Sequence, residues 1–499
     1  MVSAYSLSPA EIRLIKRMLL LRPKPTNQMI LAYFTRPGRD LNHRIIAEID
    51  SGSRGALEPP ATEGETLAYM AAVANLRFPD GRDFTPQGQF YAPGGAIGQL
   101  RLHWWPVGQG LFSSGALTLS GRRPLTWVFD CGTVSGSSLL DAALDGFENS
   151  QHAISSREIT VAAISHFDRD HINGFVRLLA AHRVRMLLLP YIPLWQRILV
   201  MLQQNISASE PLAEFFIDPT GFLASRGQID EIIYVQSNGD DLPSPPSPVP
   251  FEPSGSPPEE DPLDVDYGKP PEAAEHDPAR ASKTVSVRFL RRGGSIRTAV
   301  WELVPYNDTK LLTVPSATLE ARVLPDARRL LRASSDAARD AALASLGGIY
   351  DATFGKGPGP RNRISLFLYS GPLDQRIRLE TISSSHPVGL REETTRFSQM
   401  YTGDARLKTK REWNEFELFF QPGQRLANSA ILQIMHHGSK GNWQSGIASA
   451  LAPSVSLFCS DPGSRPFHPH AEVLREFWPH FPVQVDTRIG FHLSARLRL

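Results

Sequence analysis

Ile164-Ser165-His166-Phe167-Asp168-Arg169-Asp170-His171 is the stretch that decides the fold and the site predicted for this chain. It ends an apolar run, 159–164, that is typical of a buried strand. Four potential metal ligands follow within six residues: His166, Asp168, Asp170 and His171. Imidazole and carboxylate groups bind Zn²⁺, Mn²⁺ or Fe²⁺. Four ligands so close together are better divided between two ions than crowded around one, although the stretch alone is also compatible with a charged surface loop.

Two later segments supply further groups of the same kinds. Tyr401-Thr402-Gly403-Asp404 places a single aspartate after a glycine, which suits a carboxylate that bridges two ions. Ile434-Met435-His436-His437-Gly438-Ser439-Lys440 ends another apolar strand with two histidines, and either His436 or His437 is a candidate ligand. Ser439 and Lys440 are candidates for holding an anion. Four of the 14 histidines fall at these two strand ends, which scattered core histidines would not do.

The chain around these motifs has the pattern of a layered α/β domain. Alternating or fully apolar runs predict strands at 100–105, 116–119, 125–129, 159–164, 184–189, 363–369, 430–435 and 455–459. Helical patterns cover 172–181 and 318–346. The order of strand, helix and strand is typical of an α/β fold. We therefore expect one α/β domain over residues 99–499.

The order HxDxDH, TGD and HHGS resembles the metallo-β-lactamase fold, an αββα sandwich, and in particular its ComEC-like branch. Other segments resemble that branch as well: Val128-Phe129-Asp130-Cys131-Gly132, Asn362-Arg363-Ile364-Ser365-Leu366, Phe467-His468-Pro469-His470 and Asp486-Thr487-Arg488-Ile489-Gly490. Asp130 is expected to lie behind the metal loop as an orienting residue. The resemblance covers residues 100–499 apart from insertions.

The resemblance implies a metal-dependent hydrolase, with a phosphodiesterase or nuclease activity and two divalent ions, Zn²⁺ or Mn²⁺. The first ion would be held by His166, Asp168 and Asp404. The second would be held by Asp170, His171, Asp404 and either His437 or His436. Asp170 would also orient the nucleophile, and the phosphate or leaving oxygen would meet Ser439, Lys440 and His468. A solvated lysine at 440 and a structural hydrogen bond for His468 are the alternatives.

The chain also departs from the wider superfamily. That superfamily usually has one more histidine between the first motif and the bridging aspartate. Here only His182, His276 and His386 lie in this interval, none at a strand end, so we expect that ligand to be missing. Hydrolysis of an amide, thioester or lactone remains an alternative. A DNA- or partner-recruited effector of a multi-protein system is another.

Residues 1–55 form a basic helical segment, with nine Lys or Arg against four acidic residues. Helices are predicted over 9–21 after a Ser8 cap, over 27–35 and over 42–50. The turn Arg36-Pro37-Gly38-Arg39 separates the last two, so the unit resembles a helix-turn-helix domain. We expect it to bind nucleic acid or a protein partner. Residues 56–98 are predicted to be a connector, with a helix near 66–76.

Composition limits the remaining possibilities. Twelve prolines lie between Pro243 and Pro278, and eleven acidic residues with one lysine lie between Asp240 and Asp277, so an insertion at about 240–280 is predicted to be disordered. No apolar run is long enough for a membrane span. The two cysteines, Cys131 and Cys459, are too few for a disulfide framework, and a cytoplasmic protein with buried thiols is expected. The net charge of +1 points to no particular partner.

Overall fold

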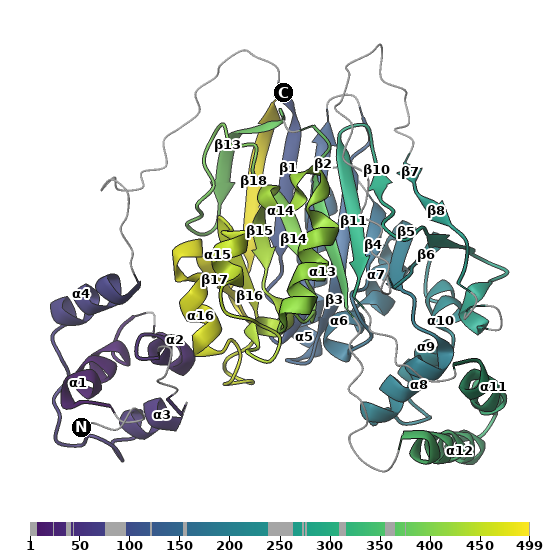
Figure 1. Cartoon of the computed structure of the whole chain (residues 1–499), viewed down its shortest axis with the longest axis horizontal. Helices are drawn as coiled ribbons and strands as arrows, with labels where there is room; N and C mark the ends of the chain where they lie inside the picture. The colour runs from purple at the N-terminus through teal and green to yellow at the C-terminus, as the bar shows by residue number, and fades with distance from the viewer. Residues whose placement is uncertain are drawn as a thin grey trace.

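The protein is described from a computed structural model. It describes residues 7–22, 24–35, 41–42, 44–74, 96–119, 122–152, 157–237, 263–271, 274, 277–308, 316–354, 365–374 and 376–498. Two mixed β-sheets lie at its centre (Figure 1). The larger sheet has the strand order β13 (Arg378–Ser384), β18 (Phe491–Arg498), β1 (Ala96–Trp104), β2 (Gly110–Leu119), β3 (Leu125–Thr133), β4 (Glu158–Ala163), β5 (Arg183–Pro190), β6 (Ile229–Val235), β9 (Ser286–Leu290) and β8 (Tyr267–Gly268). The smaller has the order β17 (Pro482–Val485), β16 (Val455–Cys459), β15 (Ser429–Gln433), β14 (Ser398–Tyr401), β12 (Leu366–Pro372), β11 (Trp301–Asn307), β10 (Ile296–Arg297) and β7 (Asp264–Val265).

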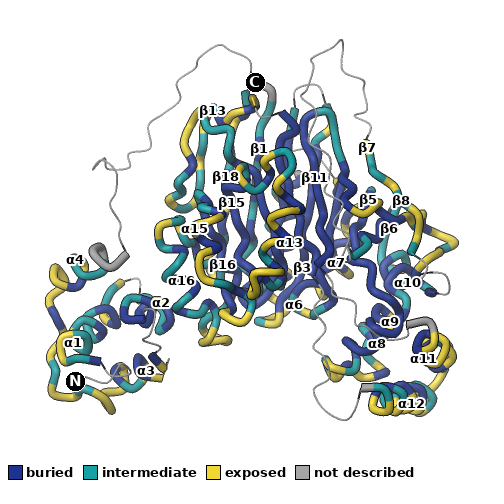
Figure 2. The backbone as a smooth tube through the Cα atoms, viewed as in Figure 1, coloured by how far each residue is buried: buried dark blue, intermediate teal, exposed yellow. Residues whose placement is uncertain are grey.

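The two sheets pack face to face through large aromatic side chains. Trp127 of β3 lies 6.1 Å from Trp301 of β11 between ring centroids, and its indole N–H donates to the Tyr401 hydroxyl at 3.0 Å. The central strands of both sheets, such as β3 and β15, are buried on both faces (Figure 2). Strands β13 and β18, near one edge of the larger sheet, alternate between buried and more exposed residues.

Helices cover the outer faces of both sheets. On the larger sheet these are α5 (Ser137–His152), α7 (Phe175–Ala181), α8 (Leu194–Gln203), α9 (Pro211–Ile217), α10 (Pro219–Ala224), α11 (Ser316–Arg332) and α12 (Asp336–Phe354). On the smaller sheet they are α13 (Lys410–Phe420), α15 (Ile447–Leu451) and α16 (Ala471–Phe477). The α/β sandwich of two sheets predicted from the sequence is confirmed at this level.

Parallel strands bring the sequence motifs to one edge of the sandwich. Strands β3 to β6 run parallel in the larger sheet, and β14 to β17 run parallel in the smaller one. The loops that follow β4 and β14 meet where Leu366 N donates to Ser165 O at 2.9 Å and Ser365 Oγ donates to Thr402 O at 3.1 Å. Carboxyl ends of parallel strands are the usual location of α/β functional sites.

The N-terminal helices pack against α16 of the smaller sheet's helical layer. They are α1 (Pro9–Met18), α2 (Asn27–Ala32), α3 (Arg44–Asp50) and α4 (Glu63–Ala74). The Arg475 guanidinium donates to Ala32 O at 3.1 Å and to Thr35 O at 3.0 Å, at the carboxyl end of α2. The ring of Tyr33 lies 4.4 Å from that of Trp478. Figure 1 shows α2 beside α16, with α6 (Arg169–Ile172) below the middle of the two sheets.

This helical unit differs in extent from the sequence-based expectation. The Ser8 cap is present, in a reciprocal capping box with Glu11. Helix α4 lies in the predicted connector, yet Tyr69 Oη donates to Tyr33 O at 3.1 Å, and Arg17 Nε donates to Ala61 O at 2.7 Å. The helical unit therefore continues past residue 55. Residues 36–40 and 43, which carry the predicted turn and part of the predicted recognition helix, lie outside the described residues.

The predicted disorder of the 240–280 insertion does not hold for residues 263–271, 274 and 277–280, which the structure describes; the other residues of the insertion lie outside the described part. Strand β7 pairs with β10 in the smaller sheet, and β8 pairs with β9 in the larger one, so one short segment adds a strand to each. Asp277 is buried, and its two carboxylate oxygens each accept from Arg197 at 2.8 Å. The prediction from composition does not hold for these residues, because backbone pairing and one buried ion pair hold the segment in place.

Replacing Arg197 by methionine should lower the free energy of unfolding by about 3–5 kcal/mol, because the Asp277 charge would remain buried without its partner. Arg197 also donates to the carbonyls of Ile192, Phe216 and Ile217, and its side chain is 1% exposed. Urea unfolding would measure the loss. Arg183→Met is the matched control, since its pair with Asp230 is exposed and should be worth less than about 1 kcal/mol. Equal losses in both variants would contradict the prediction.

Among the described residues, no helix is both long and apolar enough to cross a membrane. Cys131 and Cys459 are buried free thiols. Burial raises the pKa of both thiols, so neither is a reactive thiolate.

Candidate metal centre

Three loops at the carboxyl edge of the sandwich build the centre. They follow β4, β14 and β15 and carry the three sequence motifs. The side-chain amide oxygen of Gln433 accepts from the backbone N–H groups of Thr402 and Gly403, both at 2.8 Å. The backbone N–H of His436 donates to Gly403 O at 3.0 Å. The turn that carries Asp404 is therefore held by the strand that delivers the two histidines.

The backbone of two loops takes up the left-handed region. His436, His437 and Gly438 have φ values of 46°, 56° and 81° in succession. Gly403 has a φ of 50°, and a Cβ there would lie 2.6 Å from Ser165 Oγ, so glycine allows the two loops to approach. Left-handed non-glycine residues cost of order 1–3 kcal/mol each and cluster at functional sites.

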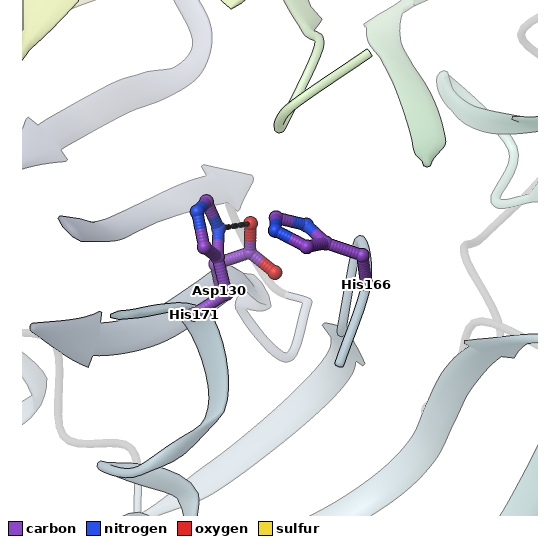
Figure 3. Close-up of side chains that lie close together, drawn as sticks. All are labelled: Asp130, His166 and His171. Carbon is purple, nitrogen blue, oxygen red and sulfur yellow. Dashed lines mark hydrogen bonds and ion pairs between the residues drawn. The ribbon is translucent and has the colours of Figure 1, made fainter. Parts of the chain in front are cut away.

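Asp130 occupies a β-bulge at the end of β3. Phe112 pairs with Cys131 and Ser113 with Phe129, so Asp130 is the extra residue, with a φ of 54°. Its Oδ1 accepts from Ser165 N at 2.7 Å. Its Oδ2 accepts from Ser165 Oγ at 2.6 Å and from His171 Nδ1 at 2.7 Å. Figure 3 shows its carboxylate directed toward the His171 ring, where an orienting residue would lie.

These contacts set the tautomer of three histidines. The carboxylate of Asp130 accepts a hydrogen bond from His171 Nδ1, and the carbonyl oxygen of Cys459 accepts one from His437 Nδ1. Ser165 Oγ donates its hydrogen bond to Asp130 Oδ2, and it therefore accepts a hydrogen bond from His166 Nδ1 at 2.8 Å. Each Nε2 then presents a lone pair, as metal-binding imidazoles do when the other ring nitrogen is held. All three Nε2 atoms and Asp404 Oδ1 are buried without a hydrogen-bond partner among the described residues.

Asp404 connects two groups of potential ligands through its two oxygens. Oδ1 lies 3.4 Å from His171 Nε2 and 3.6 Å from His437 Nε2. Oδ2 lies 3.7 Å from His166 Nε2. Asp170 Oδ2 approaches His437 Nε2 to 3.3 Å, while Asp168 Oδ2 lies 3.8 Å from His166 Nε2. His166 and Asp168 thus lie on the Oδ2 side of Asp404, and His171 and His437 lie on its Oδ1 side. Asp170 lies within reach of both groups, because its ligand atoms are within 4.8 Å of those of His171 and His437 and also of those of His166 and Asp168.

The local electrostatics favour a bound cation. Burial opposes charge on His171, but the carboxylates of Asp130, Asp404 and Asp170 raise its pKa well above the ordinary value. Burial also opposes ionisation of Asp404, yet the surrounding imidazoles hold its pKa well below the ordinary value. For His166, burial lowers the pKa to about 4, which leaves its ring neutral near pH 7. A divalent cation would supply the positive charge that the carboxylates attract.

The two adjacent histidines are not equivalent. His437 is 3% exposed, and its orphaned Nε2 points at Asp170 and Asp404. The side chain of His436 is 37% exposed, and its Nδ1 lies 2.8 Å from Asp404 Oδ2. The geometry favours His437 as the ligand and places His436 against the Asp404 carboxylate.

The residues predicted to bind an anion, Ser439, Lys440 and His468, make contacts of their own around the centre. Ser439 Oγ accepts from Gly441 N at 3.3 Å, and Lys440 Nζ pairs with Glu472 at 3.2 Å. The half-buried His468 ring is stacked 6.1 Å from that of His437 between centroids. Burial, together with the neighbouring imidazoles, lowers the pKa of His468 to about 3. Among these candidates, His468 lies beside the centre, while Lys440 lies toward the N-terminal helices.

Several functional contacts escape sequence reasoning. Ser165 and Gln433 are the residues that hold the loops together, and Gln204 donates to Asp168 from the end of α8. A polar glutamine inside the apolar run 430–435 is the only sequence signal among them. Three further histidines lie between the first motif and Asp404 in the sequence. His182 packs on the ring of Phe147, and His386 Nδ1 forms a hydrogen bond with Ser385 Oγ. His276 lies outside the described residues.

The fold and the centre together define an α/β protein with buried His and Asp groups that could hold metal ions. No model of a known protein family matches the sequence. No curated protein matches it either. The function proposed for this protein therefore depends on the geometry of its own residues.

Proposed function

We propose that this protein is a metal-dependent phosphodiesterase, a nuclease with two divalent cations, Zn²⁺ or Mn²⁺, in its centre. One observation carries the proposal. Three imidazole nitrogens with fixed tautomers and one carboxylate oxygen are buried together without hydrogen-bond partners among the described residues. Leaving such atoms unsatisfied costs about 1–3 kcal/mol each, so their convergence favours a bound cation.

The plan of the fold supports the metallo-β-lactamase resemblance. The ligand loops lie at the carboxyl edge of two stacked sheets, between helical layers, in the order HxDxDH, TGD and HHGS. Asp130 behind the first loop and Asp168 within it are the features of the ComEC-like branch. These features support metal-dependent hydrolysis as the class of reaction. The nucleic-acid substrate is a separate part of the proposal, because one fold can host many substrates.

Paired cations would supply an activated water and neutralise phosphate charge. The residues of the chain position these parts. Asp404 presents one oxygen to each ligand group, and Asp170 lies between His171 and His437, where it would orient the attacking water. His468 would contact the phosphate or the leaving oxygen. Mixed imidazole and carboxylate ligands are compatible with both metals, with a preference for Mn²⁺ as carboxylates increase.

The test is cleavage of end-labelled single- and double-stranded DNA, and of end-labelled RNA, with added Mn²⁺ or Zn²⁺. Wild-type protein is expected to cleave, and the Asp170→Ala/His171→Ala variant should be inactive at any metal concentration, because the second ligand group loses two of its members. Metal-bound wild-type protein that leaves DNA and RNA intact would refute the proposal and favour amide, thioester or lactone substrates.

A further inference from the structure

Asp168 is the most exposed of the carboxylates at the metal centre. Its side chain is 47% exposed, against 18% for Asp170 and 10% for Asp404. It precedes α6, a helix whose residues are all described, but its side chain makes no capping hydrogen bond to that helix. A half-exposed aspartate that the backbone does not hold can change rotamer, so an orienting contact has to come from another part of the chain.

Gln204, at the end of α8, supplies that contact. Its side-chain amide donates a hydrogen bond to Asp168 Oδ1. The other carboxylate oxygen, Oδ2, lies 3.8 Å from His166 Nε2, which is the atom expected to bind the same ion. The three histidines with fixed tautomers each have a comparable contact with a neighbouring residue. Gln204 therefore gives Asp168 the same kind of support that the imidazole ligands receive.

The ending of α8 fixes the position of Gln204, which is the residue that caps the helix. Asn205 follows it with a φ of 52°, and its backbone N–H donates to Leu202 O at 3.1 Å. The backbone N–H of Ile206 donates to Met201 O at 3.2 Å. These two bonds around a left-handed residue form a Schellman motif, in which asparagine is one of the favoured residues. Ile206 and Met201 are also buried in the same core cluster, so packing holds the turn as well.

The body of α8 is anchored too, and the loop that follows it meets the metal loop a second time. The first eight residues of the helix, 194–201, are all buried. Arg197 forms the buried ion pair with Asp277 and donates to three backbone carbonyls. Beyond the helix, Glu210 forms an ion pair with Arg169, which is the residue directly after the aspartate ligand. The amide therefore reaches the metal loop from a rigid element.

We infer that Gln204 is a positioning residue for metal binding, and that it acts through Asp168 on the side of the centre where His166 lies. The inference rests on the proposed two-metal function and deepens it. By holding Oδ1, the amide keeps Oδ2 directed into the centre, so less ordering of the carboxylate is needed when a cation binds. Binding on the side of His171 and His437 does not depend on this contact, since other neighbours hold those two rings.

The experiment titrates the metal-free full chain with Mn²⁺ alone and measures the free ion by electron paramagnetic resonance. The wild type should bind two ions. Gln204→Met keeps the length of the side chain but removes the donor, so one of the two affinities should fall about tenfold while the other stays unchanged. This loss is at the lower end of the range for such contacts, because water can partly replace the amide beside a half-exposed carboxylate. Gln236→Met is the matched control: the Gln236 amide donates to Lys269 O at 2.8 Å, and its loss should change neither affinity.

A double-mutant cycle separates positioning of the ligand from general support of the fold. Because Gln204 acts through Asp168, Gln204→Met should cause no further loss of Mn²⁺ affinity in a chain that already carries Asp168→Ala. Fewer than two ions on the wild type, unchanged affinities in Gln204→Met, or equal losses in the two backgrounds would overturn the inference. Two bound ions and the tenfold loss, but no cleavage of DNA or RNA, would support the inference and overturn the proposed reaction instead.

Discussion

Asp404→Asn should reduce metal-dependent hydrolysis by roughly four orders of magnitude or more, the range found when a residue central to a catalytic unit is removed. Asp404 presents one oxygen to His166 and the other to His171 and His437. The amide removes a negative charge. It also introduces N–H donors, which would occupy the lone pairs of the histidine Nε2 atoms. Hydrogen bonds would then fill the place that the wild type leaves for a cation.

The folded structure should tolerate this substitution, which separates loss of function from loss of fold. The amide can donate to up to two of the orphaned Nε2 atoms, so the thermal unfolding midpoint in EDTA should be equal to or above that of the wild type. Metal content after dialysis would be measured by mass spectrometry beside the rate of DNA cleavage. Asp326→Asn is the matched control, since Asp326 is also a buried aspartate, but it pairs with Arg329 and Ser345 on the outer helices. Stoichiometric metal with full activity in Asp404→Asn would contradict the two-group assignment.

Asp130→Asn should weaken metal affinity by about 10–100-fold although Asp130 is not expected to bind the metal. Its two oxygens accept three hydrogen bonds, from Ser165 N, Ser165 Oγ and His171 Nδ1. An asparagine must turn its NH₂ group toward one of these donors. In one orientation His171 is driven to the tautomer that carries its proton on Nε2, and in the other the Ser165 backbone N–H loses its acceptor. Asparagine is also tolerated at positive φ, so the bulge should persist.

The measurement is a competition titration of metal against a chelator, with the unfolding midpoint recorded in parallel. Ser165→Ala should give a smaller loss, because it frees the ring of His166 and removes one hydrogen bond to Asp130 but leaves the contact of Asp130 with His171. Asp218→Asn controls for the change of carboxylate to amide: Asp218 caps α10 through Gly221 N at 2.9 Å, and asparagine caps helices equally well. Unchanged metal affinity in Asp130→Asn would show that the tautomer of His171 does not limit binding.

The parts of the fold that sequence predicts best are local. Apolar runs followed by His and Asp clusters mark β4 and β15 because strand and ligands are adjacent in the chain. Asp404 lies between His166 on one side and His171 and His437 on the other, and its bridging of two ions stays a prediction. Motif order also places Asp130 behind the first loop, where its contacts with Ser165 and His171 lie.

The parts that sequence misses depend on contacts between distant residues. Arg197 and Asp277 are 80 residues apart, and nothing near either one signals the other, so a composition rich in proline and acidic residues suggested disorder through Asp277. Lys440 follows the histidine motif directly, yet its side chain turns toward Glu472 and the N-terminal helices. The position of α2 against α16 is likewise decided by Arg475, whose role is invisible in its own segment.

The pairing of β1 with β18 has a consequence for how the chain is made. Gln99 donates to Ser494, which is 395 residues further along the chain, and β1 lies between β18 and β2 in the larger sheet. At about 5–20 residues per second, a ribosome would need roughly 20–80 s to deliver the partner strand after β1. Throughout that interval β1 is an edge strand with unpaired backbone groups, open to pairing with other nascent chains. The yield of folded protein should therefore depend on chaperones that shield this edge during synthesis.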